Sequence, residues 1–267
     1  MMNKTVTLLA AFLLAAVAGP AVASGGDIRL EPALVNRLDL PSLQRGARTF
    51  VNYCLTCHSA RFMRYNRLTD IGVDLPMIQD NLMFATDRIG DTMTVAMSAQ
   101  DGKAWFGVAP PDLSVIARVR GTDWLYNYFL GFYKDDAARS GWNNLVFPNV
   151  GMPHVLSRYS GTNRLVTTEY EDHEKAEAAA IAARSLVVLA PARDHRYAVE
   201  SLAVETPGTM SQVEYKAMVA DLVNYLDYMA EPVKNERISL GLIALLYFVL
   251  LFVFAYWLKR EYWKDIH

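Results

Sequence analysis

Cysteine is scarce in this chain, and so is any excess of charge of one sign. Only two of the 267 residues are cysteines, Cys54 and Cys57, so no second cysteine pair exists to complete a four-ligand zinc site. The 26 Lys and Arg residues nearly balance the 28 Asp and Glu residues, which leaves a formal net charge of −2. A chain this close to neutral lacks the basic surface of a nucleic-acid-binding protein, and we expect no nucleic-acid partner.

Both cysteines belong to one short motif, Cys54-Leu55-Thr56-Cys57-His58. On a helical turn, Cys54, Cys57 and His58 fall at i, i+3 and i+4, so two thiols and an imidazole point from one face toward one object. A haem satisfies all three, because each thiol can add across a vinyl group of the porphyrin while a ring nitrogen of His58 takes one axial position on the iron. The motif therefore predicts one covalently attached haem c.

A thioredoxin-like redox pair is the main alternative interpretation of a Cys-x-x-Cys motif. Such a pair normally lies between a strand and a helix of a βαβ unit, and the sequence around Cys54 shows no such alternation. A thioether-linked haem needs cysteines that are free and reduced at assembly, and the chain offers no third cysteine to mispair with them. These points favour the haem.

The two ends of the chain carry membrane-related signals. Residues 1–23 predict an export signal, with Lys4 before an apolar run and a small-residue cleavage site at Ala21-Val22-Ala23; an uncleaved N-terminal anchor is the alternative. Residues 238–258 form a run of 21 residues without a charge, about 31 Å long as a helix, which matches a hydrocarbon core of about 30 Å. Aromatic and basic residues follow in the tail 259–267, an asymmetry that places the tail in the cytoplasm.

Between these signals we expect one domain over 24–237, since no internal repeat or low-complexity linker divides it. Apolar spacing predicts a helix over 42–58 that leads into the cysteine motif, and a second helical piece over 62–68. Residues 141–168 contain many Gly, Pro and Asn residues, which predict a loop-rich insertion. Residues 169–183 predict a solvated surface helix.

Further along the chain, Pro111 and Arg120 are candidates for supporting a haem. The carbonyl of Pro111, in the rigid Ala109-Pro110-Pro111 segment, is the kind of acceptor that orients an axial histidine through its Nδ1 proton, although a plain turn is an equal interpretation. Arg120 lies in a helix that begins near 112–114 and is interrupted at Gly121. Its guanidinium can pair in a fork with a haem propionate, although exposed helical arginines are commoner.

The sixth iron ligand decides between electron transfer and chemistry at the iron. Met210 follows a turn-forming run and directly precedes Ser211-Gln212-Val213-Glu214, a capping box for a helix that continues to about Ala230. A methionine where a loop enters a helix is well placed to approach an iron, and a thioether suits a low-spin haem. Met152, in another loop, and His154 remain alternatives.

Three blocks of sequence together resemble the cytochrome c1 family. They are RGARTFVNYCLTCHSARFMRYNRL, GVAPPDLSVIARVRG and ETPGTMSQVEYKAMVADLVNYLDYMAEPV, followed by a single C-terminal span. The resemblance implies that Met210 is the sixth ligand beside His58, that Arg120 helps to hold a propionate, and that the proline segment with Pro111 lines the haem. It also implies a mainly α fold: a class I cytochrome c-like haem domain with loop-rich insertions and one transmembrane helix.

The same resemblance implies a function. The chain would be the electron-transfer subunit of ubiquinol:cytochrome c reductase, the cytochrome bc1 complex, accepting an electron from the Rieske iron-sulfur protein and passing it to a cytochrome c. Its partners would be cytochrome b, the Rieske protein and the lipid bilayer, in a bacterial cytoplasmic membrane with the haem on the periplasmic side. A haem enzyme of peroxidase type with a labile sixth ligand is the alternative; a sensor is a third, although the tail after Leu258 is too short for an output domain.

Overall fold

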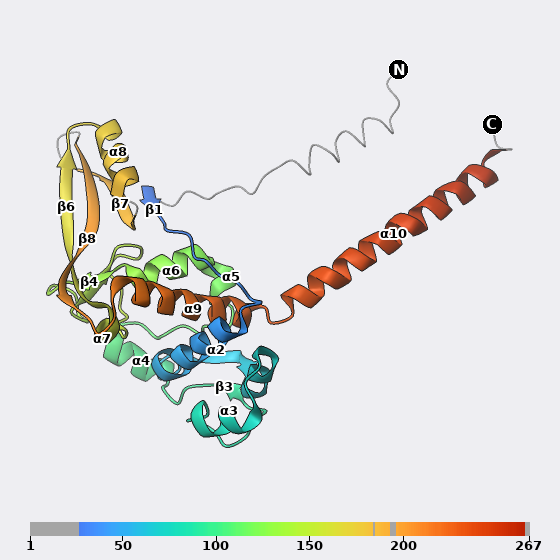
Figure 1. Ribbon diagram of the computed structural model, residues 1–267, viewed down its shortest axis with the longest axis horizontal. Coiled ribbons are helices and arrows are strands. Elements are labelled where there is room, and N and C mark those ends of the chain that lie inside the picture. The colour runs from blue at the N-terminus through green and yellow to red at the C-terminus, as the bar shows by residue number, and fades with distance from the viewer. Residues whose placement is uncertain (1–26, 184, 193–195, 265–267) are drawn as a thin grey trace. The chain divides into compact units, whose positions relative to one another are not determined.

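The computed structural model describes residues 27–183, 185–192 and 196–264, which form two compact units. The predicted export signal at 1–23 lies outside the described residues. The larger unit covers Leu30–Leu165 and everything from Leu202 onward, and the smaller unit is built around Val166–Ser201 with the strand at Asp27–Arg29. Figure 1 shows the elements of both units.

The larger unit is mainly helical. Its helices are α2 (Leu40–Thr49), the π-helix η1 (Phe50–Cys54), the 3₁₀-helix η2 (Tyr65–Ile71), α3 (Leu75–Asn81), α4 (Ala99–Phe106), α5 (Ile116–Arg120), α6 (Thr122–Leu130), α7 (Ser157–Ser160), α9 (Gln212–Ala230) and α10 (Lys234–Tyr262). Two short antiparallel strand pairs accompany them, formed by β2 (Ala60–Arg64) with β3 (Thr92–Met93) and by β4 (Phe132–Lys134) with β5 (Trp142–Asn144). The expected mainly α fold is confirmed.

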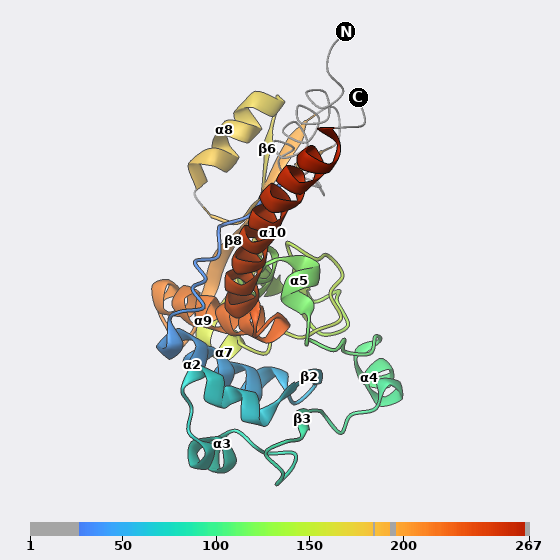
Figure 2. The ribbon, with the colours of Figure 1, turned by 90° about the vertical axis from the view of Figure 1, so that its right-hand side faces the viewer.

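Helices α2 and α9 pack against each other at the centre of this unit, as Figure 2 shows. Their backbones approach closely at Gly46, where a Cβ atom would lie 2.1 Å from the carbonyl oxygen of Asp221 and 2.7 Å from Cβ of Tyr225. Only a glycine permits that approach. The apolar faces of both helices, with the fully buried Tyr225 of α9 and the fully buried Phe50 directly after α2, form the core on which the cysteine motif rests.

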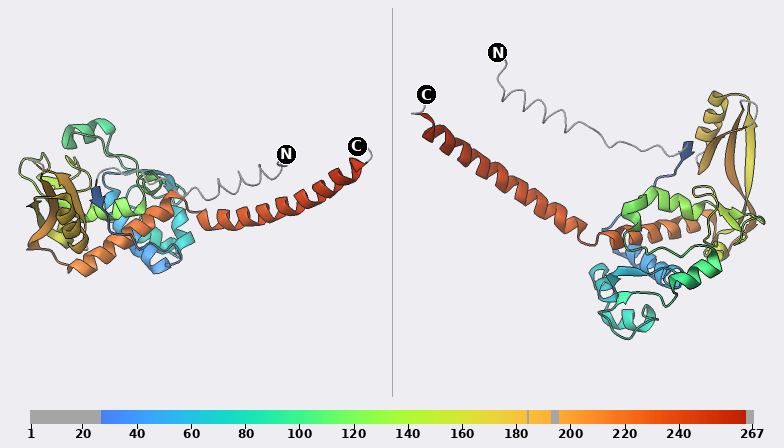
Figure 3. Two further views of the ribbon diagram at one scale, coloured as in Figure 1. Left: turned by 90° about the horizontal axis from the view of Figure 1, so that it is seen from above. Right: turned by 180° about the vertical axis from the view of Figure 1, so that it is seen from behind.

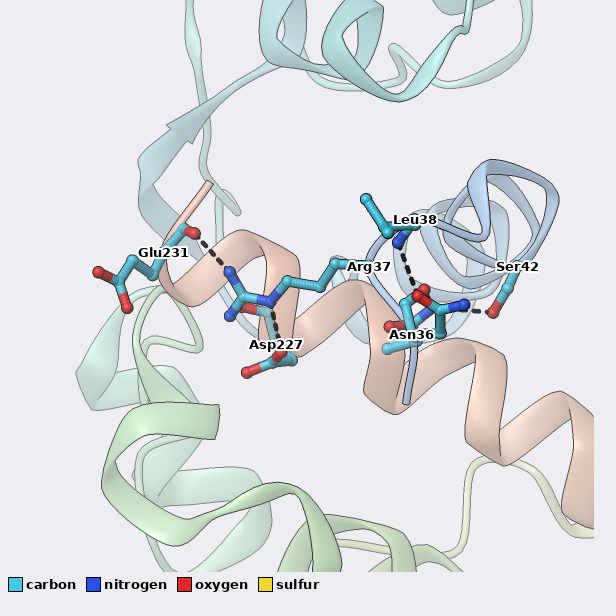
Figure 4. A network of polar contacts seen from close by, with 7 residues as sticks. Asn36, Arg37, Leu38, Ser42, Asp227 and Glu231 are labelled. Atoms are coloured by element: carbon cyan, nitrogen blue, oxygen red, sulfur yellow. Dashed lines mark hydrogen bonds and ion pairs between the residues drawn. The ribbon is translucent and has the colours of Figure 1, made fainter. Parts of the chain in front are cut away.

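The segment before α2 is held to the C-terminal end of α9 by a polar network, drawn in Figure 4. The guanidinium of Arg37 donates to the carboxylate of Asp227 at 2.5 Å and to the carbonyl oxygens of Asp227 at 2.5 Å and Glu231 at 2.6 Å. The side chains of Arg37 and Asp227 are only 10% and 15% exposed, so this ion pair is largely shielded from water. Asn224 in α9 adds a hydrogen bond to Ser42 in α2 at 3.0 Å.

The smaller unit contains most of a four-stranded sheet in the order β1-β7-β8-β6. Its strands are β1 (Asp27–Arg29), β7 (Val187–Pro191), β8 (Tyr197–Pro207) and β6 (Gly161–Tyr170), and β6 and β8 both continue into the larger unit. Helix α8 (His173–Ala183) packs on β7 through Ala176 and Ala180. The predicted surface helix over 169–183 therefore exists from His173 onward, but one of its faces is buried.

The structure tests three further expectations from the sequence. The loop-rich interpretation of 141–168 is wrong at both ends, because β5 and β6 lie there. The expected helical piece at 62–68 is wrong in its first half, where strand β2 pairs with β3, and is a 3₁₀-helix in its second half. The break at Gly121 is confirmed: this residue has φ of +85° and separates α5 from α6.

The C-terminal apolar run is one continuous helix, α10, visible end to end in Figure 3. It extends from Lys234 to Tyr262, and none of its residues is buried within the chain. Its length and composition are sufficient to cross a membrane. Because its apolar side chains find no cover in the part of the chain that is described, a lipid environment accounts for them.

Candidate haem-binding site

The cysteine motif lies where helix α2 changes its winding. The π-helix Phe50–Cys54 closes with a hydrogen bond from the amide of Leu55 to the carbonyl of Phe50, and a turn follows in which the amides of Cys57 and His58 donate to the carbonyl of Cys54 at 3.1 and 2.9 Å. Single π-helical turns inside helices are frequent at functional sites. Here the wider turn and the following bend bring both sulfur atoms and the imidazole to one hollow.

That hollow has mostly apolar walls, and three segments far apart in the sequence supply them. The cysteine motif with Tyr53 forms one wall, the end of α4 with Pro110 and Pro111 a second, and the loop 151–155 the third. The residues that line it are Tyr53, Cys54, Cys57, His58, Phe106, Val108, Pro110, Pro111, Gly151, Met152, Pro153 and Val155. Two thiols and one imidazole in an apolar surround are the donor set that a covalently held porphyrin needs.

His58 is oriented by a backbone carbonyl. Its Nδ1 lies 2.7 Å from the carbonyl oxygen of Pro111, which can only accept, so Nδ1 carries the proton and Nε2 keeps a free lone pair. Burial lowers the pKa of His58, while the Pro111 carbonyl and the charge of Asp112 oppose that shift. The imidazole is thus neutral and pre-oriented as a ligand through Nε2.

The proline segment that carries this carbonyl is itself pinned to the strand after the cysteine motif. The amide of Leu113 donates to the carbonyl of Ser59 at 2.8 Å, and the amide of Arg61 donates to the carboxylate of Asp112 at 3.0 Å. The amide of Phe62 donates to the hydroxyl of Ser114 at 3.0 Å. These hydrogen bonds fix the Pro111 carbonyl relative to His58, because they join the segment that carries Pro111 to the segment directly after His58.

The two thiols are free and protonated. Burial raises the pKa of Cys54 to about 12, with a smaller contribution from Cys57, and burial also raises the pKa of Cys57. A redox-active Cys-x-x-Cys pair has a lowered thiol pKa, because its reactive form is the thiolate. Burial shifts the pKa values of Cys54 and Cys57 in the opposite direction, which argues against the thioredoxin-like interpretation.

Two methionines lie near this site, in different hollows. Met152 lines the hollow of the cysteine motif, and its sulfur accepts a hydrogen bond from the hydroxyl of Tyr128 at 3.5 Å. Met210 lines a neighbouring hollow, and Tyr53 is part of both linings. Within the described residues, no hydrogen bond reaches the sulfur of Met210. The thioether of Met210 is therefore uncommitted, whereas that of Met152 already has a donor.

The local structure around Met210 agrees with the expected helix start. Ser211 is the N-cap of α9, its hydroxyl accepts from the amide of Glu214, and the Glu214 carboxylate accepts from the amide of Ser211 at 2.8 Å. The capping box is confirmed, and α9 ends at Ala230 as expected. Val213 and Ala217, near the start of α9, are exposed, because this end of the helix extends beyond the core.

The two other candidates are His154 and Arg120. His154 is not available as a ligand: it is 5% exposed, its ring stacks on Phe132, and its Nε2 lies 2.7 Å from the hydroxyl of Ser160. Arg120 is exposed at the end of α5, where its guanidinium lies over the ring of Trp124, 4.8 Å from the centroid. It is outside the lining of the cysteine hollow, so the structure does not bring it together with Cys54, Cys57 and His58.

Sequence reasoning missed a tyrosine pair that joins the two hollows. The hydroxyls of Tyr53 and Tyr159 lie 2.5 Å apart, and their rings meet edge to face. The position of Tyr53, directly before Cys54, was a signal that could have drawn attention to it. Its partner Tyr159 is 106 residues away, and no local pattern indicates that contact.

Comparison with known proteins identifies the family of the chain. A family profile described as the cytochrome C1 family matches residues 31–94 and 201–266, which include the cysteine motif and Met210. The cytochrome c1 of Allochromatium vinosum is 42% identical over 261 residues, covering 97% of this chain and 98% of the relative. The cytochrome c1 of Rhodospirillum rubrum is 26% identical over 285 residues and covers 97% of this chain.

Another relative carries a different name. A protein of Nitrosomonas europaea called ammonia monooxygenase gamma subunit is 44% identical over 257 residues, covering 96% of this chain and 97% of the relative. It matches over the same length as the cytochromes c1, so the similarity alone does not separate the names. With near-full-length identity of 42% to a cytochrome c1 and a family profile that spans the haem motif, the chain belongs to the cytochrome c1 family.

Proposed function

We propose that this chain is the electron-transfer subunit of a cytochrome bc1 complex, whose haem c accepts one electron from an iron-sulfur protein and passes it to a cytochrome c. Cytochromes c1 carry a covalently bound haem c. The observation that carries the proposal is the turn Cys54–His58, which presents two protonated thiols and an imidazole held by the Pro111 carbonyl to one apolar hollow.

The residues of this chain then divide the work of holding the cofactor. The thiols of Cys54 and Cys57 would hold the porphyrin through two thioethers, each formed by addition to a vinyl group with the sulfur bonding to one carbon and the proton going to the other. His58 would offer Nε2 to the iron, and its hydrogen bond to Pro111 fixes the orientation of the ring. When bound, the haem iron carries one electron by alternating between its ferrous and ferric states.

We assign the sixth coordination position to Met210. Its sulfur is free of hydrogen bonds within the described residues, its amide is anchored at 3.1 Å to the carbonyl of Tyr159, and the capping box fixes the helix that follows. Met152 is the competing candidate because it lines the hollow, but its sulfur already accepts a hydrogen bond from Tyr128. With His58 and Met210 as its ligands, a haem would have the raised reduction potential that an electron relay at the high-potential end requires.

Arg120 remains a proposed partner of a propionate. Its side chain is exposed and rests on Trp124, so pairing with a carboxylate needs a rotation of the guanidinium away from the indole. Bidentate hydrogen bonds between the guanidinium and a propionate would favour that rotation.

We further propose the topology of a single-pass protein of the bacterial cytoplasmic membrane. Residues 1–23 would direct export and be removed, 24–237 would form the periplasmic haem domain, 238–258 would lie in the bilayer within α10, and 259–267 would be cytoplasmic. The span holds the haem domain at the membrane surface beside cytochrome b and the Rieske protein, which oxidise the quinol. The apolar length of α10 and the basic residues at its C-terminal end support this arrangement.

Affinity purification of the full-length chain from membranes tests this role. We expect co-purification of a b-type cytochrome and an iron-sulfur protein, with quinol-dependent reduction of the c-type haem. Recovery instead with an ammonia-oxidising enzyme would support the role named for the Nitrosomonas relative and refute the proposal. The comparisons do not support a peroxidase; a high-spin haem that binds carbon monoxide rapidly would contradict the relay.

A further inference from the structure

Two glycines allow the chain to cross itself directly before Met210. A Cβ atom on Gly208 would lie 2.0 Å from the carbonyl oxygen of Tyr159 and 2.3 Å from the amide nitrogen of Gly161. A Cβ atom on Gly161 would lie 2.0 Å from the carbonyl oxygen of Thr206 and 2.5 Å from the amide of Gly208. All of these neighbours are backbone atoms, which cannot move aside as the end of a flexible side chain can. No side chain larger than hydrogen fits at either position.

Hydrogen bonds tie the two strands of this crossing together. The amide and the hydroxyl of Thr209 both donate to the carbonyl of Arg158, at 3.0 and 3.2 Å. The amide of Met210 donates to the carbonyl of Tyr159 at 3.1 Å. Gly161 has φ of +78°, a conformation that favours glycine, and there the chain leaves α7 (Figure 1). Met210 is thus fixed by the crossing on one side and by the cap of α9 on the other.

We propose that the crossing of Gly161 and Gly208 is a non-covalent strap that holds Met210 in position to ligate the haem iron, an inference that rests on the proposed assignment of Met210. The chain has no cysteine beyond the two of the haem motif, so no disulfide can brace this loop. Contacts between backbone atoms brace the loop instead. The three hydrogen bonds of Thr209 and Met210 form only at the close approach that the two glycines permit.

The strap acts on the position of a ligand and contributes no chemistry of its own. A methionine is a weak, neutral ligand, so its bond to iron depends on how much entropy the loop loses when the bond forms. A loop that is already ordered loses little. If the crossing is forced apart, the loop gains conformations in which the Met210 sulfur is away from the iron, and the sixth position opens to water or carbon monoxide.

The test compares Gly208→Ala with Gly90→Ala in the full-length holoprotein in detergent. Gly90 is the matched control, since nothing lies within 4 Å of the methyl group that an alanine would add there and its φ is not in the left-handed region. We expect Gly208→Ala to lose most of the methionine-to-iron absorption band and to bind carbon monoxide at least ten-fold faster, whereas Gly90→Ala behaves as the parent. An unchanged band and unchanged carbon monoxide binding in Gly208→Ala would overturn the strap.

A second pair of variants separates the crossing from general backbone strain. Gly161→Ala and Gly141→Ala both place alanine at a positive φ, +78° and +72°, but nothing lies within 4 Å of the new methyl group at Gly141. Only Gly161→Ala should weaken the methionine band. Equal effects of the two variants would show that strain rather than the crossing is responsible.

Hydrogen exchange of the Thr209 and Met210 amides provides a readout that does not depend on which residue ligates iron. Thr209→Val removes the hydroxyl that donates to Arg158 and leaves the glycines intact, so it serves if Gly208→Ala does not fold. Loss of one hydrogen bond predicts about five-fold faster exchange of the Met210 amide; unchanged exchange would contradict the strap. If exchange responds but Met210→Leu keeps the methionine band, the strap stands as a loop brace and the ligand assignment fails.

Discussion

Protonation of His154 should make this protein sensitive to acid between pH 6.5 and 4. The side chain is 5% exposed, lies against Phe132 and Trp142, and contacts Ser160 through Nε2. Burial lowers its pKa from 6.5 to about 4. Between pH 6.5 and about pH 4, the unfolded chain binds a proton at His154 and the folded chain does not. The contribution of His154 to stability is therefore fully present above pH 6.5 and is lost as the pH falls through this window.

The size of the effect follows from the shift. Each pH unit corresponds to about 1.4 kcal/mol, so a difference of about 2.5 units removes about 3 kcal/mol by pH 4. Guanidinium unfolding of the full-length protein in detergent, measured from pH 7.5 to 4 for the parent and His154→Gln, isolates this contribution. The glutamine stays neutral, and its amide can still contact Ser160.

We expect the difference in unfolding free energy between the two proteins to shift by about 3 kcal/mol in favour of the variant on going from pH 7.5 to 4. His173→Gln is the control, because it removes a histidine that lies on α8 with half of its side chain exposed. Parallel curves for the parent and His154→Gln, within about 1 kcal/mol, would refute the reasoning.

Two further variants, Arg37→Ala and Gly46→Ala, test the framework that carries the site, and Arg88→Ala is the control for the first. Arg37→Ala leaves the shielded Asp227 carboxylate without its partner and should cost about 3–5 kcal/mol in denaturant unfolding. Arg88→Ala, from an ion pair in which the arginine is 82% exposed, should cost less than about 1 kcal/mol, and equal losses would contradict this account. Gly46→Ala forces α2 away from α9 and should lower the unfolding free energy by about 1–3 kcal/mol. An unchanged unfolding free energy would show that the two helices can move apart without cost and would contradict this account.

The parts of the site that could be predicted from sequence are those determined by neighbours along the chain. The cysteine motif is one turn, in which the Cys57 and His58 amides bond to Cys54. The capping box spans Ser211 to Glu214, and the apolar run of α10 is continuous. Each depends on contacts within a few residues, so periodicity and cap chemistry are sufficient to recognise it.

The parts that escaped prediction depend on distant partners. Strands β7 and β8 pair with each other, and β1 joins them from the other end of the chain, so the composition of 187–207 alone did not indicate a sheet. The sequence predicts a helical piece over 62–68, but residues 60–64 pair with Thr92–Met93 and form strand β2. The Pro111 carbonyl was an open choice between a turn and a support for His58 until the fold brought them within 2.7 Å.

The identity of the sixth ligand is the point on which the functional account depends. Met210 and Met152 both lie near Tyr53, in adjacent hollows, and only one can bind the iron. Replacing either with leucine conserves the volume while removing the sulfur, so the two variants are matched. The methionine-to-iron charge-transfer band of the oxidised holoprotein reports the ligand directly.

The most direct test is that band in the parent, Met210→Leu and Met152→Leu. We predict that the parent and Met152→Leu show it with equal intensity, while Met210→Leu lacks it and gains carbon monoxide binding. A band that survives in Met210→Leu and disappears in Met152→Leu would contradict the assignment, and a parent that is high-spin would contradict the electron relay.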